Sequence, residues 1–153
     1  MTNDLYPLTL FFDSACPMCH AEMRALEARD ARARLRFADV HAAGFEPPAG
    51  TTMTALMEAI HGRTADGRLV VGVEALRLAY AAVGLGWIAA PTAWPLLRGA
   101  SERAYRWVAR HRYALPRWLG LAAAGLRPSE AATRRAAEAA ARRARCTDST
   151  CQR

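Results

Sequence analysis

Residues 8–19, LTLFFDSACPMC, carry the most information about the fold of this 153-residue chain. The apolar run at 8–12 predicts a buried strand, and the residues that follow Cys16 have helical periodicity. Pro17 suits the first turn of that helix, because its ring fixes φ near the helical value and its missing N–H is not needed there. Cys16 and Cys19 therefore lie where a strand turns into a helix.

This placement predicts thiol–disulfide exchange. Two cysteines separated by two residues at such a junction are typical of redox-active dithiols. A thiol at a helix N-terminus faces unpaired N–H groups and the positive end of the helix dipole, which stabilise the thiolate. The helical pattern turns Cys19 inward with Met23 and Leu26, so we expect Cys19 to be buried and Cys16 to be exposed at the tip. Cys16 is then the predicted nucleophile, and Cys19 resolves the mixed disulfide.

The rest of the pattern predicts an α/β domain with the element order β-α-β-α-β-β-α. A hairpin is indicated by Ala65-Asp-Gly67 between two apolar segments. This order is that of a thioredoxin-like sheet with helices on both faces. The expected elements are strand 8–13, helix 17–30, strand 35–40, helix 51–57, strands 59–64 and 68–71, and helix 74–83.

We expect three parts along the chain. Residues 1–84 form the redox core, residues 85–145 form a helical extension packed on it, and residues 146–153 form a flexible tail that contains cysteine. Within the extension, Ser101 is expected to cap a helix over 102–112, and a second helix is expected over 129–145.

An uncharged stretch at 78–97 is long enough to be considered as a membrane span. Its glycines and prolines instead favour the end of one helix, a glycine turn and the start of another. We therefore expect no integral span, with a peripheral membrane contact through Trp87 and Trp94 as an alternative.

Composition restricts the function classes further. All 21 basic residues are arginine, and the net charge of +7 accompanies abundant alanine, which indicates compositional bias rather than nucleic-acid binding. The N-terminus has no basic and apolar leader, so we expect a cytoplasmic protein. In that compartment C-x-x-C is more often catalytic or metal-binding than a structural disulfide.

With Asp13 included, the motif is Asp13-x-x-Cys16-x-x-Cys19, and it resembles the DCC family of thiol–disulfide oxidoreductases. The resemblance extends to the hairpin Thr64–Arg68, to Gly72–Ala75 and to Arg110–Tyr113. It implies a thioredoxin-like enzyme that exchanges its dithiol with disulfides of proteins or small thiols. It implies no metal and no organic cofactor, and an unidentified reductant would recycle the enzyme.

Four other residues near the dithiol have predicted roles. Asp13 is either a general base for Cys19, with a pKa raised by burial, or a residue that caps the helix or orders the loop. Pro17 and Met18 lie between the sulfurs and should tune the reduction potential, and a protonated His20 would favour the thiolate. The other histidines (His41, His61 and His111) are scattered, and none is paired with an acid at the spacing of metal ligands. The tryptophans and tyrosines of 80–118 are interpreted as helix-packing residues.

The sequence leaves other hypotheses open for the function of the four cysteines. Cys16-x-x-Cys19-His20 matches the pattern for covalent haem attachment, which normally requires export. Cys146 and Cys151 could form a second dithiol, or join Cys16 and Cys19 in a four-thiolate zinc site, or be part of a solvent-exposed tail. The rival function is a non-catalytic module that binds zinc or a protein through the same cysteines.

Overall fold

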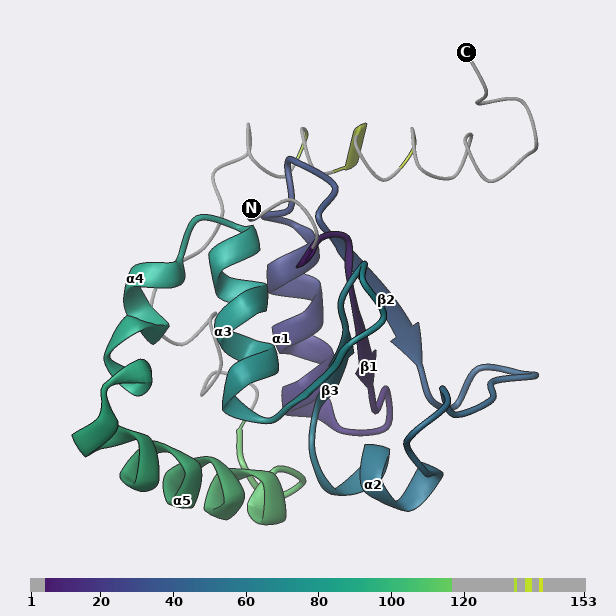
Figure 1. Cartoon of the computed structure of the whole chain (residues 1–153). Coiled ribbons are helices and arrows are strands. Elements are labelled where there is room, and N and C mark those ends of the chain that lie inside the picture. The colour runs from purple at the N-terminus through teal and green to yellow at the C-terminus, as the bar shows by residue number, and fades with distance from the viewer. Residues whose placement is uncertain (1–4, 117–133, 135–136, 139–140, 142–153) are drawn as a thin grey trace.

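The structure, a computed structural model, describes residues 5–116 and, beyond them, residues 134, 137, 138 and 141. The predicted order β-α-β-α-β-β-α is confirmed, and further helices follow it (Figure 1). The elements are β1 (Leu8–Phe12), α1 (Pro17–Glu27), β2 (Leu35–Asp39), α2 (Met53–Glu58), β3 (His61–Arg63), β4 (Leu69–Val71), α3 (Val73–Ala82), α4 (Gly86–Ala89), the 3-10 helix η2 (Ala90–Ala93) and α5 (Pro95–His111).

The four strands form one sheet in the order β2-β1-β3-β4. Strands β1 and β2 are parallel, which requires a crossover connection, and α1 supplies it. Strand β3 runs antiparallel to both β1 and β4, and Gly67 at φ +87° makes the hairpin turn between β3 and β4. The result is a thioredoxin-like α/β fold, as predicted.

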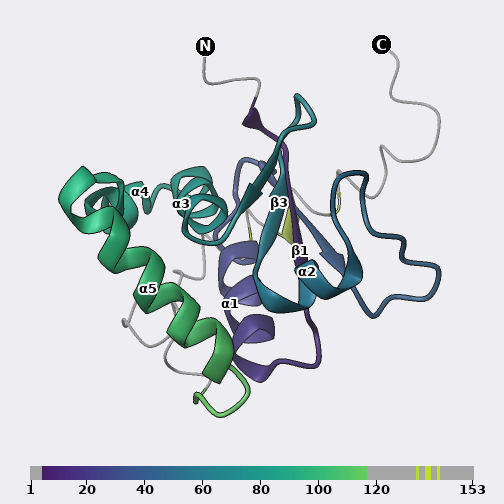
Figure 2. The same cartoon turned by 60° about the horizontal axis from the view of Figure 1, so that its bottom comes forward.

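Strand β1 is buried on both faces of the sheet. Leu8 and Leu10 pack on one side with residues of α1 and α3. Phe11 packs on the other side with Val40, which follows β2, and with Leu56 of α2. Figures 1 and 2 show α1 and α3 side by side against one face of the sheet. Because side chains pack against both faces of β1, this strand holds the start of α1 in a well-defined position.

The predicted and observed helix bounds differ most at α5 and α1. Helix α5 begins at Pro95, a residue favoured in the first turn, so Ser101 lies inside the helix and does not cap it. Helix α1 ends at Glu27 rather than at residue 30. The buried Asp30 accepts hydrogen bonds from the N–H groups of Arg34 and Leu35 and so turns the chain into β2.

Helix α5 is attached to the core by Tyr105, whose hydroxyl accepts a hydrogen bond of 2.8 Å from the N–H of Ile60 just before β3. Among the described residues, no helix is both long and apolar enough to cross a membrane. Of the predicted helix 129–145, the structure describes residues 134, 137, 138 and 141, which are helical. The tail 146–153 falls outside the described residues, and the division into three parts stays a prediction.

Gly72 provides a test of the packing of α5 against the turn before α3. Its φ of +62° is unfavourable for any residue with a Cβ, and an added Cβ would lie 3.1 Å from the Tyr105 ring. We expect Gly72→Ala to lower the free energy of unfolding by roughly 1–3 kcal/mol, measured by urea denaturation. Gly84→Ala is the control, because its φ of +80° imposes a similar backbone strain while nothing lies within 4 Å of its added Cβ. Equal unfolding midpoints for the two variants would contradict this account of the α5 contact.

Candidate active site

Cys16 is the N-cap residue of α1. Its backbone is extended, with φ −84° and ψ 112°, and its Sγ accepts a hydrogen bond of 3.3 Å from the N–H of Cys19. The Cys19 thiol also hydrogen-bonds to Cys16. Both cysteines are free thiols. The sulfur of Cys16 is therefore an acceptor at the start of α1, and the thiolate character of Cys16 stays a prediction.

The predicted exposure of the two sulfurs is wrong. Cys16 is 0% exposed, whereas Cys19 is partly exposed. The Sγ of Cys16 lies 3.9 Å from the carbonyl oxygen of Arg112, just after α5. Helical periodicity describes only the helix itself, and it could not show that a segment 96 residues later covers the tip of α1.

Cys19 is held in its protonated form. Burial raises the pKa of its thiol to about 12, and the hydrogen bond to Cys16 and the proximity of that sulfur act in the same direction. A thiol with this pKa is a poor nucleophile at neutral pH. Part of the shift depends on Cys16, so it would diminish once Cys16 is bonded to another sulfur.

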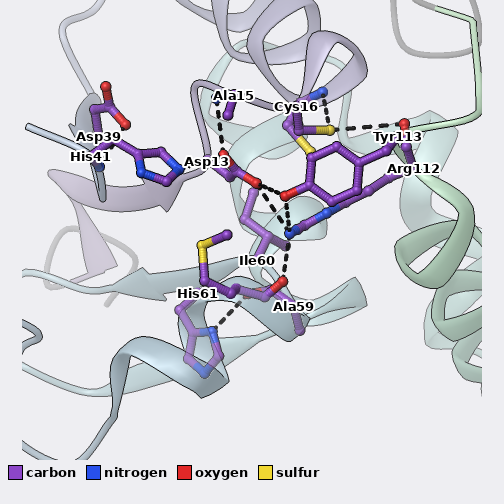
Figure 3. A network of polar contacts seen from close by, with 12 residues as sticks. Asp13, Ala15, Cys16, Asp39, His41, Ala59, Ile60, His61, Arg112 and Tyr113 are labelled. Carbon is purple, nitrogen blue, oxygen red and sulfur yellow. Dashed lines mark hydrogen bonds and ion pairs between the residues drawn. The ribbon is translucent and has the colours of Figure 1, made fainter.

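Asp13 follows β1 directly and is 2% exposed. One carboxylate oxygen accepts hydrogen bonds from the N–H of Ala15 at 2.9 Å and from Nε2 of His41 at 2.8 Å. The other accepts from Nη2 of Arg112 at 3.2 Å and from the hydroxyl of Tyr113 (Figure 3). This network joins the end of β1, the loop before α1 and the residues after α5.

The expected rise in the pKa of Asp13 is not found. Burial by itself raises the pKa of this carboxyl, but the hydrogen bonds from Tyr113, His41 and Ala15 and the charge of Arg112 outweigh it. The pKa therefore lies below its ordinary value, and Asp13 is an ion-pair partner of Arg112. Of its predicted roles, ordering the loop is supported by the bond to Ala15, while Cys16 rather than Asp13 is the N-cap.

Sequence reasoning missed the partners of Asp13. His41 pairs with an acid that lies 28 residues before it, and Arg112 and Tyr113 lie about 100 residues after it. The only signal for the last two was that Arg110–Tyr113 formed part of the family resemblance, without a role attached. The guanidinium of Arg112 also donates to the carbonyl of Met57 at 2.5 Å, which holds the end of α5 against α2.

The residues between and beside the sulfurs are placed as follows. Pro17 occupies the first turn of α1, and Met18 lines a cavity together with Cys19. His20 is exposed, and its ring lies 6.5 Å from the ring of Phe12, centroid to centroid. Their effect on the reduction potential stays a prediction.

Within the described part of the chain, no group of three or more His, Cys, Asp or Glu side chains could hold a metal ion. Cys146 and Cys151 lie outside that part, so the structure tests neither the second dithiol nor the four-thiolate zinc site.

Comparison with known proteins agrees with the dithiol chemistry. A family model described as DCC1-like thiol-disulfide oxidoreductase matches residues 10–118. An uncharacterized chloroplastic protein of Arabidopsis thaliana is 33% identical over 86 residues, which cover 54% of this chain and 40% of that protein. No solved structure matches. The matched residues 10–118 include Asp13, both cysteines, Arg112 and Tyr113, and the chain belongs to the DCC1-like thiol-disulfide oxidoreductase family.

Proposed function

We propose that this protein catalyses reversible exchange between the Cys16–Cys19 dithiol and a disulfide in a protein or a small molecule. The observation that carries the proposal is the hydrogen bonding of the two cysteines. The Sγ of Cys16 accepts from the Cys19 N–H at the start of α1, while Cys19 keeps its proton. Cys16 is therefore the thiol that attacks the substrate, and Cys19 is the thiol that reacts in the second step.

The reaction proceeds in two substitutions at sulfur. The Cys16 thiolate attacks one sulfur of the substrate disulfide, so that the substrate S–S bond breaks, a mixed disulfide forms and one thiolate leaves. Cys19 then loses its proton and attacks the Sγ of Cys16. This step forms the Cys16–Cys19 disulfide and releases the second thiolate. The protein is oxidised by two electrons, the substrate is reduced to two thiols, and an external thiol reductant restores the dithiol.

The end of α5 has to move for the first step to occur. Cys16 is 0% exposed and is covered by the carbonyl of Arg112. The covering segment is held by the bonds of Arg112 and Tyr113 to Asp13 and of Arg112 to the Met57 carbonyl. Substrate access to Cys16 therefore depends on local opening at these bonds.

Trapping of the mixed disulfide tests the roles of the two cysteines. We expect Cys19→Ser to accumulate a covalent adduct with a substrate thiol on Cys16, because the resolving thiol is absent. Cys16→Ser should accumulate none. Intact-mass spectrometry with peptide mapping gives the readout. Stable adducts on Cys19 in the Cys16→Ser variant would reverse the assigned roles.

The same samples test the rival function, a non-catalytic module that binds zinc or a protein. Metal content is measured on the full chain together with disulfide reduction. If wild-type protein and Cys16→Ser are equally inactive and both contain stoichiometric zinc, the enzymatic proposal is overturned. Activity that is lost in Cys16→Ser supports it.

Tyr113 provides a test of the opening step. Tyr113→Phe removes a hydrogen bond to the Asp13 carboxylate, and bonds to charged groups contribute on the order of 1.5 kcal/mol. Since Tyr113 is 54% exposed, solvent reduces this contribution, and we expect Cys16 to be alkylated by iodoacetamide several-fold faster. Arg110→Gln is the matched control on an exposed side chain of α5. Equal alkylation rates in wild type and Tyr113→Phe would show that this bond does not limit access to Cys16.

A further inference from the structure

A cavity of about 190 Å³ lies beside Cys19 of the dithiol, lined by residues of β1, α1, α2, α3 and α5 and by flanking residues. Cys19 forms part of its wall. The cavity is otherwise lined mainly by apolar and aromatic side chains, among them Met18, Leu76, Tyr80, Tyr105 and Val108. The proposed exchange reaction needs a dithiol but gives no reason for such a space beside it.

The charged side chains in the cavity wall already have partners. Asp13 is paired with Arg112, and a carboxylate oxygen of Glu22 accepts a hydrogen bond of 2.5 Å from the hydroxyl of Tyr80. An additional carboxylate or ammonium group in this space would lose its hydration without gaining a dedicated partner, which is costly. An uncharged, apolar group would instead be stabilised by contact with the wall.

We propose that this cavity binds an apolar group, the size of one aromatic ring or a branched aliphatic chain, attached to a sulfur of the substrate disulfide. The size agrees, because an apolar cavity of about 150 Å³ holds benzene. The inference rests on the proposed dithiol–disulfide exchange and specifies its substrate class. The apolar group comes either from a small-molecule disulfide or from a side chain beside a substrate cysteine.

The cavity and the covered sulfur open together. Tyr105, Val108 and Arg112 belong to the wall, and Arg112 also covers Cys16. Movement of this part of α5 would therefore expose Cys16 and widen the entrance to the cavity. In the mixed disulfide on Cys16, the apolar group lies beside Cys19, the residue that displaces it.

A second hollow, of about 530 Å³, shares Tyr105, Ala109 and Arg112 with the wall of the first. Its wall includes Arg106, Arg110 and Glu58, so it would suit an anionic group instead. Binding of substrate through that hollow is the competing assignment, and it predicts the opposite order of substrates.

Three alkyl disulfides distinguish the two assignments. The pre-reduced full-length protein is mixed with benzyl 2-hydroxyethyl disulfide, bis(2-hydroxyethyl) disulfide or glutathione disulfide. Formation of the Cys16–Cys19 disulfide in a single turnover is followed by peptide mass spectrometry. All three release alkyl thiolates, so differences in leaving group contribute little. We expect the second-order rate constant for the benzyl compound to exceed the other two by about tenfold or more.

Filling the cavity should remove this preference. Val108→Trp places an indole in the space, and we expect the ratio of benzyl to hydroxyethyl rate constants to fall to about two or less. Ala104→Trp, on an exposed residue of α5 that lines neither space, is the control and should keep the wild-type ratio. Two peptides with a disulfide, one flanked by Phe and one by Ser, show whether a protein side chain can supply the group.

The outcomes separate this inference from the proposed function. If the wild-type protein reacts with all three disulfides at similar rates, or fastest with glutathione disulfide, the assignment of the cavity is overturned while the exchange reaction stands. If no disulfide oxidises Cys16 and Cys19, the proposed function is overturned, and the inference with it. The wild-type comparison needs no variant, so a misfolded Val108→Trp would not obscure the result.

Discussion

The ion pair between Asp13 and Arg112 is the interaction on which the site depends. Both side chains are almost completely buried, and their charged atoms lie 3.2 Å apart. A buried carboxylate without a partner is strongly unfavourable, so Asp13 at the end of β1 requires a cation there. The chain supplies that cation from 99 residues away, just after α5. The end of the last described helix is thereby fixed against the beginning of the redox motif.

This interaction orders the site and also covers it. The same Asp13 carboxylate holds the loop before α1 through the N–H of Ala15, which positions Cys16 as the N-cap. Through Arg112 it holds the carbonyl that covers the Cys16 sulfur. Bonds that stabilise the folded site thus oppose access to its nucleophile. Such opposition between stability and reactivity is common at functional sites.

The features that the sequence predicted correctly are those decided by neighbouring residues. The strand–helix junction at Cys16 and Pro17, the hairpin at Gly67 and the order of the elements follow from local hydrophobic patterns and turn chemistry. Strand β1 was recognisable as buried because its residues are apolar on both faces. A family resemblance added Asp13 to the site, but it could not assign partners to that residue.

The features that were missed depend on contacts between distant segments. The buried sulfur of Cys16 contacts the carbonyl of Arg112, and hydrogen bonds from Tyr113 and His41 help to lower the pKa of Asp13. None of these pairs has a spacing that a sequence pattern could reveal. The start of α5 at Pro95 was missed because Ser101, a residue type favoured at helix caps, lies inside the helix.

The environments of the two sulfurs differ in a way that the C-x-x-C spacing alone does not require. Cys16 faces a backbone carbonyl and two hydrogen-bond donors, whereas Cys19 faces an apolar space and keeps its proton. One turn of α1 separates the polar, buried position of Cys16 from the apolar, partly exposed position of Cys19. Helix α5 lies next to both cysteines. Its position therefore determines whether a substrate reaches Cys16 and also which substrate group can lie beside Cys19.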